Sequence, residues 1–480
     1  MAAASRVALL LLLAIVGARA DETPHEACPR STGAVEPLAT TPPVLPWLLS
    51  KAGSISPLVE LATRDGRRGF FAHEDIAAGT ELLSVPLGLL MTLDTLFESE
   101  LGTSGIVGGL DLSDTDAMVV QVLAEKYRGD ESPWAAFLSS MPPRASMHQL
   151  HFFSPDELAH LDVSKLRNLA ELRQTAIKRA YEDVREQLAD FAPPEPFISP
   201  HLTADDFAWA ISIVWSRSFG VPFPGEDSPA PALVPVGDLF NYAPDECVNV
   251  VSRTVDYRFV FSATHDVRKG EELLVHYGQS MSNAQMLLDY GFTMNDVLDG
   301  DAVPLRDEVL LRVPPPTAMD NHFAIKERLL DSLHAPQVDF TYAVRRDLIP
   351  NQLMSILRVL NLNRDEAVAT LTVQQVMDTV NRRNERAAIR MLRDLAREQL
   401  AAYATTLADD VARLSDAALP VRERAALVIV AGEKRVLHHV IDFTTGVLRD
   451  ARAAERASGL VDPDEDVVDE DEDDDVHGDL

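Results

Sequence analysis

The stretch VPVGDLFNYAP, residues 234–244, joins a short apolar run to a bend that carries polar side chains. Asp238 and Asn241 stand in an otherwise apolar setting, and Pro244 follows shortly after Tyr242. Asn and Asp are typical of turns, and Pro interrupts a strand ladder. By composition alone the stretch is a turn after a buried segment. Its neighbours in the chain decide whether it is also a site.

Three other segments combine glycine, aromatic and charged residues in a similar way. Glycines that let a backbone approach a ligand closely stand in DGRRGFFA, residues 65–72. Arg217 lies in WSRSF, residues 215–219, shortly before the opening stretch. Tyr277 ends an apolar, strand-like run in LLVHYGQSMSNAQMLLDYGF, residues 273–292. Each segment alone would be an ordinary turn or strand end, so the interpretation depends on their order along the chain.

In this order the segments resemble the SET-domain protein methyltransferases. The opening of the SET domain is similar to RRGFFAHEDIAAGTELLSVP, its Asn-His segment to GDLFNYAP, and its closing Tyr segment to ATHDVRKGEELLVHYGQSMSNAQMLLDYGF. The start of a helical insertion between the two halves resembles SPWAAFLSSMPP, residues 132–143. The helical substrate-binding domain of Rubisco large-subunit lysine methyltransferase and of actin-histidine methyltransferase resembles residues 405–437, TTLADDVARLSDAALPVRERAALVIVAGEKRVL.

The resemblance implies an α+β fold with a SET-domain β core and pseudoknot, a helical insertion and an all-α C-terminal domain. It covers about residues 46–450. The divisions expected along the chain are a signal peptide at 1–20, a flexible leader at 21–45, the SET N-terminal half at 46–100, the helical insertion at 101–205, the SET C-terminal half at 206–304, the helical substrate-binding domain at 305–452 and an acidic disordered tail at 453–480.

Apolar periodicity predicts helices in the insertion and near the C-terminus. Thr203 is a plausible N-cap because acids follow it in the first turn. A C-terminal helix is expected from about Val421, after Pro420, to about Leu448. In the insertion, one helical face is expected to contain Leu166, Leu169, Ile177, Val184 and Leu188.

The resemblance further implies S-adenosyl-L-methionine as the methyl donor. In the family, the Arg matching Arg217 contacts the donor's carboxylate, which suits a bidentate guanidinium. The Asn matching Asn241 anchors the donor, and the Tyr matching Tyr277 borders the methyl-transfer channel. The implied catalytic residue is Tyr277, and the implied donor-binding residues are Arg68, Gly69, Phe70, Arg217, Asp238, Asn241, Tyr242, Tyr290 and Phe292. Tyr242 departs from the family, which usually has His at this position.

The implied function is S-adenosyl-L-methionine-dependent transfer of a methyl group to a lysine side chain of a protein substrate. Methyl transfer from a sulfonium is an in-line displacement by a neutral nitrogen. Because lysine has an unperturbed pKa of about 10.4, the site must accept the amine without its proton. A protein-histidine N-methyltransferase is one alternative. The residue at Tyr242 keeps a second alternative open, a catalytically inactive SET-derived protein-binding module.

Charge restricts the class of partner. The 480 residues include 43 Lys and Arg against 75 Asp and Glu, which gives a formal net charge of −32. A nucleic-acid binder needs a basic face for phosphates, so we expect no nucleic-acid partner. The expected partner is a protein substrate bound by the C-terminal helical domain, and the enzyme itself is expected to be a monomer.

The cysteines and histidines indicate no metal site. Two cysteines, Cys28 and Cys247, cannot supply a zinc cluster. They either pair as a disulfide or remain two unpaired thiols. The 13 histidines show no convincing ligand spacing, so no metal is expected.

The two ends of the sequence predict where in the cell the protein is located. The first residues, MAAASRVALLLLLAIVGARA, have the basic, apolar and small-residue regions of a secretory signal. No later segment reaches the roughly 18 apolar residues that predict a membrane span. The C-terminal HGDL resembles the HDEL retention signal, with Gly478 as the departure. We therefore expect the secretory pathway and the endoplasmic-reticulum lumen, with a plastid or another organelle as the alternative.

Overall fold

The computed structural model describes residues 33–190, 198–278, 281–294, 307–316, 322–334 and 341–457. The predicted signal peptide, the predicted retention signal and Cys28 lie outside these residues. Among the described residues, no helix combines the length and the apolar character needed to cross a membrane.

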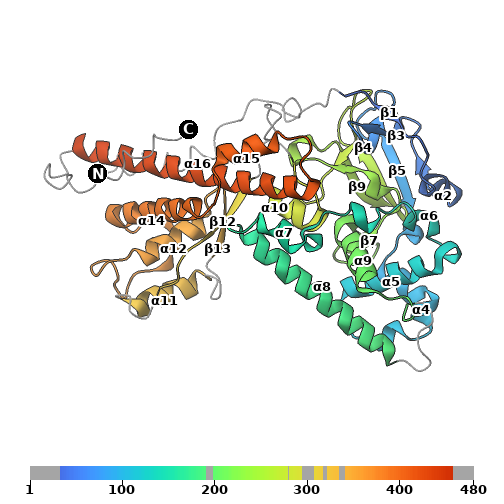
Figure 1. Cartoon of the computed structure of the whole chain (residues 1–480), viewed down its shortest axis with the longest axis horizontal. Helices are drawn as coiled ribbons and strands as arrows, with labels where there is room; N and C mark the ends of the chain where they lie inside the picture. The colour runs from blue at the N-terminus through green and yellow to red at the C-terminus, as the bar shows by residue number, and fades with distance from the viewer. Residues whose placement is uncertain are drawn as a thin grey trace.

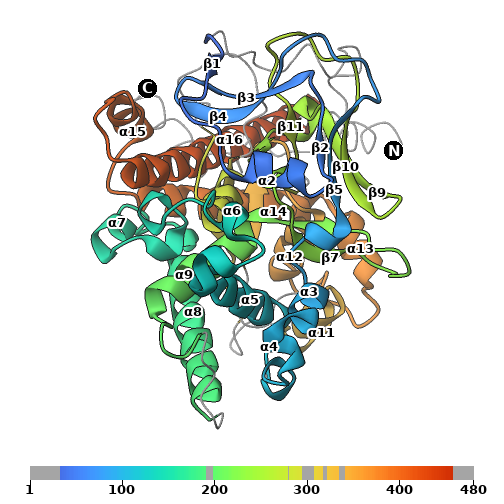
Figure 2. The ribbon, with the colours of Figure 1, turned by 90° about the vertical axis from the view of Figure 1, so that its right-hand side faces the viewer.

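The part of the chain predicted as the SET domain, called the SET half below, forms small sheets that join its two separated sequence halves (Figure 2). Its strands are β1 (Glu36–Pro37), β2 (Ser54–Ile55), β3 (Val59–Arg64), β4 (Arg67–Ala72) and β5 (Glu81–Pro86) before the insertion, and β6 (Ser218–Val221), β7 (Ala230–Leu233), β8 (Asn241–Tyr242), β9 (Val250–Val255), β10 (Arg258–Ala263) and β11 (Leu274–Val275) after it. Its short helices are α2 (Val44–Ser50), η1 (Leu87–Leu89), α3 (Leu93–Glu98), η6 (Gly237–Leu239), η7 (Asp245–Cys247), α10 (Asn283–Gln285) and the π-helix η8 (Met286–Tyr290).

Pairing between β5 and β10 connects the sequence halves across the insertion. These strands are the central pair of a sheet with the order β2-β5-β10-β9. Their register sets Phe259 opposite Val85 and Phe261 opposite Leu83, and all these side chains are buried. Such buried pairs of an aromatic and an aliphatic side chain across two strands stabilise a sheet. A second sheet, with the order β1-β3-β4, carries the glycine-rich segment on β4.

The closing segment of the SET half lies between β4 and β8. The backbone N–H of Leu273 donates to the carbonyl of Phe70 at 2.7 Å. β11 pairs in parallel with β8, so that Leu274 lies opposite Asn241. The three SET segments that stand out in the sequence therefore meet at one place, although they are far apart along the chain.

The ring of Phe240 packs between the two sheets at this meeting point. Its centroid lies 4.8 Å from that of Phe70 on β4 and 5.0 Å from that of Phe261 on β10. Phe240 is 1% exposed. Gly237 leaves room for this packing, since a Cβ there would lie 2.8 Å from Cζ of Phe261. The apolar part of the opening stretch is therefore a piece of the core.

The insertion packs its helices on the SET core (Figures 1 and 2). Its elements are α4 (Glu100–Thr103), η2 (Val107–Gly109), α5 (Asp114–Arg128), η3 (Gly129–Glu131), α6 (Ala135–Leu138), η4 (Arg144–Ser146), η5 (Leu150–Phe152), α7 (Pro155–Ala159) and α8 (Lys165–Ala189). The next helix, α9 (Ala204–Arg217), lies almost entirely in the predicted SET C-terminal half. Val122 on α5 and Phe207 on α9 belong to the same apolar core as Phe259.

The predicted cap of α9 is confirmed, and one residue of the predicted face of α8 is wrong. The side chain of Thr203 accepts a hydrogen bond from the N–H of Asp206 at 3.1 Å. On α8 the predicted Leu169 is 39% exposed, and Ala170 is buried in its place. The reason is geometric, because position 170 is four residues after Leu166 and seven before Ile177, which keeps it on the buried stripe.

The C-terminal region is mostly helical, as expected, but it also contains a two-stranded antiparallel sheet. Its elements are β12 (Glu308–Arg312), α11 (Phe323–Ser332), β13 (Thr341–Arg345), α12 (Asn351–Leu360), α13 (Val373–Asp378), α14 (Arg382–Ala401), α15 (Leu407–Leu414) and α16 (Val421–Ala457). This sheet departs from the expected all-α domain. It forms because alternate side chains of the two strands, such as those of the paired residues Val309 and Val344, are buried in the local core. α16 begins at Val421 as predicted and continues into the segment predicted as tail.

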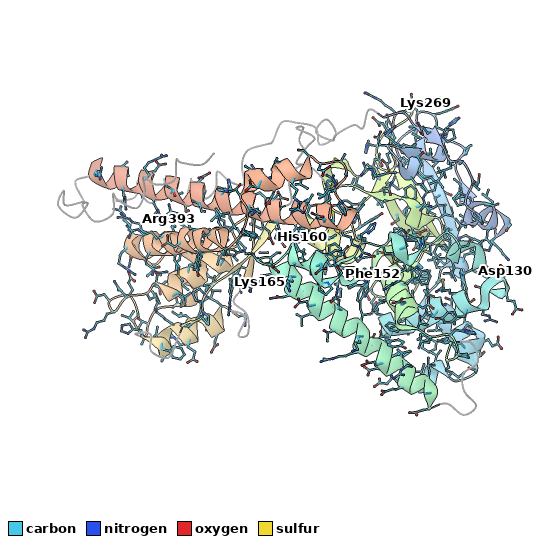
Figure 3. The ribbon with its side chains drawn as sticks, viewed as in Figure 1. Asp130, Phe152, His160, Lys165, Lys269 and Arg393 are labelled. Carbon is cyan, nitrogen blue, oxygen red and sulfur yellow. The ribbon has the colours of Figure 1, made fainter. Side chains whose placement is uncertain are left out.

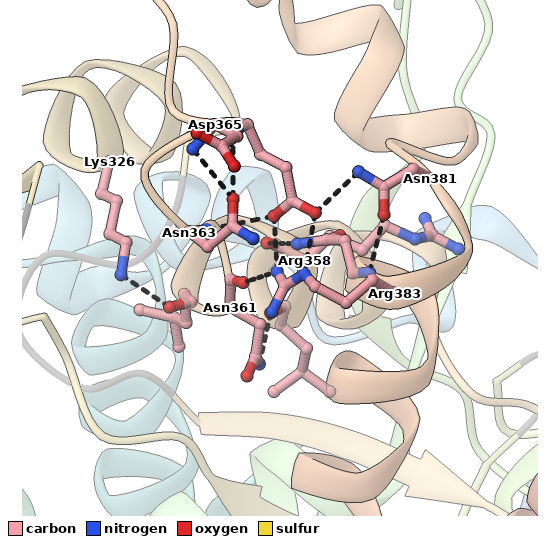
Figure 4. Close-up of polar contacts among 11 residues, drawn as sticks. Lys326, Arg358, Asn361, Asn363, Asp365, Asn381 and Arg383 are labelled. Atoms are coloured by element: carbon pink, nitrogen blue, oxygen red, sulfur yellow. Dashed lines mark hydrogen bonds and ion pairs between the residues drawn. The ribbon is translucent and has the colours of Figure 1, made fainter. Parts of the chain in front are cut away.

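Buried charged side chains connect the segments around α12, α13 and α14 (Figure 4). Arg358, 4% exposed, donates to Glu385 Oε1 at 2.8 Å and to the carbonyl of Met377 at 3.0 Å. Glu366 accepts from Asn381 at 2.6 Å and from Nε of Arg383 at 2.8 Å. These charge-assisted bonds tie the loops around α12 and α13 to the start of α14.

α16 connects this region to the insertion (Figures 1 and 3). Near its start, Arg422 donates to the carbonyls of Phe152 at 2.8 Å and of Met147 at 3.0 Å. Further along, the carboxyl of Glu433 accepts from the hydroxyls of Ser164 at 2.6 Å and Tyr403 at 2.7 Å. Burial raises the pKa of Glu433 to about 7, although both hydrogen bonds act in the opposite direction.

Cys247 lies half-buried in η7 and is disulfide-bonded, which excludes the alternative in which it is an unpaired thiol. No free cysteine occurs among the described residues.

The raised pKa of Glu433 predicts a pH-dependent stability. The folded state favours the protonated carboxyl, so its stabilising contribution is complete below the ordinary pKa of 4.5 and is lost as the pH rises through about 7. Relative to Glu433→Gln, the wild-type free energy of unfolding should fall by roughly 3 kcal/mol across this window. Chemical denaturation of both proteins from pH 5 to pH 8 measures the difference. A constant difference over this range would contradict the assignment.

Candidate functional site

Four aromatic rings gather where β8 and β11 end, those of Tyr242, Tyr277, Tyr290 and Phe292. The Tyr277 and Tyr290 rings are stacked with centroids 4.8 Å apart, and Tyr242 lies 5.6 Å from Tyr277. Phe292 lies 6.1 Å from Tyr242 and 6.3 Å from Tyr290. These four residues, called the ring cluster below, provide an apolar and π-rich surface, and ring faces of this kind attract cations.

The hydroxyl of Tyr277 has a fixed orientation within the ring cluster. It donates to the backbone carbonyl of Phe240 at 2.9 Å. Burial is the main cause that raises its pKa, so Tyr277 stays a neutral phenol at physiological pH. With its proton held by the carbonyl, the hydroxyl oxygen keeps lone pairs that can accept from a substrate.

Tyr290 contacts Tyr277 through its hydroxyl as well as through its ring. Its hydroxyl donates to the backbone carbonyl of Tyr277 at 3.1 Å. Burial again raises the pKa, to about 12 for Tyr290. Both phenols are therefore hydrogen-bonding groups at neutral pH and not bases.

A charged group adjoins the ring cluster. Arg217, the last residue of α9, donates through Nη1 to Asp238 Oδ2 at 2.8 Å and to the Asp238 carbonyl at 3.2 Å. Arg68 is close enough that Asp238 and Arg217 both influence its pKa, which burial lowers. Arg217 and Asp238 also influence the pKa of Tyr277, so the two groups are neighbours.

The charged group offers polar atoms to a further partner. Nε of Arg217 and Oδ1 of Asp238 are buried and have no hydrogen-bond partner among the described residues. Arg217 Nε together with Arg68 suits a carboxylate, and Asp238 Oδ1 suits an ammonium group. The residues present therefore fit the amino-acid end of S-adenosyl-L-methionine.

Asn241, which the resemblance implies as a donor anchor, lies where β8 meets β4. Its amide nitrogen donates to the Arg68 carbonyl at 2.7 Å and to Glu272 Oε1 at 2.7 Å. The side chain thus ties β4 to the closing segment. Gly69 makes this approach feasible, because a Cβ there would lie 2.3 Å from Glu272 Oε1 and 2.8 Å from Asn241 Nδ2.

The predicted site residues therefore divide into three sets. Tyr242, Tyr277, Tyr290 and Phe292 form the ring cluster, and Arg68, Arg217 and Asp238 form the charged group. Gly69 and Asn241 hold the strands together. Phe70 stands apart, because its ring is buried against Phe240 and its carbonyl accepts from Leu273.

Sequence reasoning missed Glu272 and the Phe240 carbonyl. Glu272 stands immediately before the apolar run Leu273–Val275, and a carboxylate at the start of such a run was the available signal. The Phe240 carbonyl could not be found this way, because backbone groups leave no trace in the sequence.

Three comparisons bear on this geometry. Residues 317–437 match the family model described as Rubisco LSMT substrate-binding. The chain is 26% identical over 386 residues to the chloroplastic [fructose-bisphosphate aldolase]-lysine N-methyltransferase of Arabidopsis thaliana, covering 78% of this chain and 76% of that protein. It is 25% identical over 419 residues to actin-histidine N-methyltransferase of Plecturocebus moloch, covering 84% of this chain and 68% of that protein.

The solved SET domain of LSMT, bound to lysine and AdoHcy, is similar with a TM-score of 0.67 and 23% sequence identity, over 87% of this chain and 93% of that chain. The fold is that of a SET-domain protein. The resemblance and the fold class inferred from the sequence are thereby confirmed.

The close packing at Gly69 predicts a large effect of a single methyl group. Gly69→Ala should lower the free energy of unfolding by about 1–3 kcal/mol, because Glu272 and Asn241 must move apart. Gly88→Ala is the matched control, since a Cβ there meets nothing within 4 Å. Thermal and chemical unfolding of both variants measures the difference. Equal stability of the two variants would show that the β4 contact tolerates a side chain.

Proposed function

We propose that the chain is an S-adenosyl-L-methionine-dependent protein-lysine N-methyltransferase. The observation that supports it most directly is the Tyr277 hydroxyl, oriented by the Phe240 carbonyl within the ring cluster and next to the Arg68, Arg217 and Asp238 group. The Arabidopsis thaliana relative, whose name is that of a lysine N-methyltransferase, gives independent support.

The charged group provides the donor end of the proposed site. Arg217 and Arg68 would hold the carboxylate of S-adenosyl-L-methionine, and Asp238 would accept from its ammonium group. When bound, the donor supplies an electrophilic methyl group on a positively charged sulfur. The ion pair to Asp238 orients Arg217, so its remaining Nε–H is already aimed before the donor arrives.

The ring cluster provides the acceptor end. Loss of hydrating water on entry to the site disfavours a charged ammonium, which lowers the pKa of an entering lysine and promotes loss of its proton to solvent. Tyr277 does not take this proton as a phenolate, because its raised pKa keeps it protonated. Its oxygen instead accepts a weak hydrogen bond that aligns the nitrogen or the transferring methyl group. The cationic product is then stabilised by the ring faces.

Tyr242 takes part in this arrangement and does not disrupt it. Its ring lies 5.6 Å from Tyr277 and 6.1 Å from Phe292, so the side chain joins the ring cluster. The substitution of the usual His therefore supports an aromatic acceptor site. We infer an active enzyme in preference to an inactive binding module.

The partner that we propose is a protein substrate held by residues 317–437, the part that matches the Rubisco LSMT substrate-binding model. This region has its own apolar core and is connected to the SET half through α16. A protein docked there would present its acceptor side chain to the ring cluster.

The role of Tyr277 is tested by Tyr277→Phe. Transfer of labelled methyl from S-adenosyl-L-methionine to lysate proteins should fall roughly 100-fold, because the aligning oxygen is lost. Mass spectrometry of the wild-type product should place the label on lysine. Tyr257→Phe is the control, because Tyr257 is 74% exposed on the β9–β10 turn. Equal labelling by wild type and Tyr277→Phe would contradict the assigned role, and label on histidine would change the acceptor.

The donor end is tested by Arg217→Gln. Loss of a charged hydrogen-bonding partner should weaken S-adenosyl-L-methionine binding by roughly 10- to 100-fold. Isothermal titration calorimetry measures the affinity, with the exposed Arg253→Gln as control. Undetectable donor binding by the wild type would favour the inactive binding module.

A further inference from the structure

The π-helix η8 presents Tyr290 as its last residue. The N–H of Gly291 reaches back to the Met286 carbonyl at 3.0 Å, which closes a turn one residue wider than an α-helical turn. Gly291 has φ 81°, a conformation that favours glycine. The position of Tyr290, and through it that of Tyr277, therefore depends on an irregular turn with weak intrinsic stability.

Arg173, from α8 in the insertion, contacts this turn. Its Nη1 donates to the Leu288 carbonyl at 2.9 Å and to Asp289 Oδ1 at 2.6 Å. The same guanidinium lies over the ring of Trp215 on α9, 4.7 Å from its centroid. The Leu288 carbonyl lies in the last turn of η8, where carbonyls have no partner within the helix. Arg173 supplies the hydrogen-bond donor that this carbonyl would otherwise lack.

Apart from backbone bonds and the bond of the Tyr290 hydroxyl to Tyr277, the other contacts described around η8 are steric and apolar. Leu287 packs in a cluster with Leu150, Phe153 and Ile429. On another side, a Cβ at Gly291 would lie 2.7 Å from the backbone nitrogen of Gln149. Such packing limits how far the turn can move but does not choose its rotation, whereas the bonds from Arg173 are directional.

We propose that Arg173 is a positioning residue for the ring cluster, acting through η8 on Tyr290 and Tyr277. It touches neither donor nor acceptor. It holds Leu288 and Asp289, and Tyr290 in turn bonds the Tyr277 carbonyl at 3.1 Å and stacks on its ring. Through this contact, the insertion sets the positions of Tyr290 and Tyr277 at the acceptor end. The kinetic consequence of this inference rests on the proposed methyltransferase function.

The guanidinium is specifically suited to this place. It bonds a carbonyl and a carboxylate while its face lies on an aromatic ring, a combination that a lysine ammonium cannot reproduce. Arg173→Lys should keep the charge and lose part of the positioning, and Arg173→Gln should lose most of it. Arg167→Gln is the matched control, because Arg167 lies on the same helix and pairs with Glu171 at 3.0 Å without contacting η8.

Hydrogen exchange of the whole chain tests the positioning directly and needs no activity. In Arg173→Gln, exchange of the peptide that spans residues 286–292 should rise roughly tenfold, with a smaller rise in Arg173→Lys and none in Arg167→Gln. Unchanged exchange of this peptide in Arg173→Gln would overturn the inference. An equal rise throughout the chain would also overturn it, because it would indicate a general loss of stability. If Arg173→Gln fails to fold, Arg173→Lys decides in the same way.

Kinetics test the consequence for the site. We expect Arg173→Gln to lower kcat roughly tenfold with an unchanged affinity for S-adenosyl-L-methionine by calorimetry, since the charged group is left intact. Adding Asp289→Asn should cost little more, because both substitutions remove the same contact. Full kcat in Arg173→Gln, or fully additive losses in the double variant, would overturn the inference. Absence of methyl transfer by the wild type would instead contradict the proposed function, and hydrogen exchange would still decide the role of Arg173.

Discussion

The packing of Phe240 between Phe70 and Phe261 is the contact on which the site depends. Its ring belongs to the core that joins the two sheets, and its carbonyl holds the Tyr277 hydroxyl at 2.9 Å. A side chain that packs against both sheets cannot move without disturbing the core. The orientation of the phenol is therefore as rigid as the fold itself, as the proposed alignment of a nucleophile with the methyl group requires.

Segments outside the SET core hold the elements around the ring cluster in position. The insertion reaches the ring cluster through Arg173, and α16 reaches the insertion through Arg422 and Glu433. These connections use charged or hydrogen-bonded groups that are partly or fully buried, and such contacts fix geometry more than they add stability. A substrate docked on the C-terminal domain would thus share a continuous frame with the acceptor end, through α16 and η8.

Much of the fold was predictable because the SET segments keep their order and residue types in the sequence. The Thr203 cap and the start of α16 at Val421 followed from local rules and are confirmed. The pairing of β12 with β13 was missed, since short strands inside a helical region form through tertiary contacts that local patterns do not encode. At the site, side chains of typical chemistry were found, but the bonds from the Asn241 amide to the Arg68 carbonyl and to Glu272 were not predicted, because such cross-segment contacts depend on the fold.

The most direct measurement of the central claim is a crystal structure of the chain with S-adenosylhomocysteine, the product of the donor. We predict that its carboxylate bonds Arg217 and Arg68, that its amino group bonds Asp238, and that the Tyr277 hydroxyl still donates to the Phe240 carbonyl next to the sulfur. A product bound with its carboxylate away from Arg217, or a Tyr277 hydroxyl turned away from Phe240, would contradict the account.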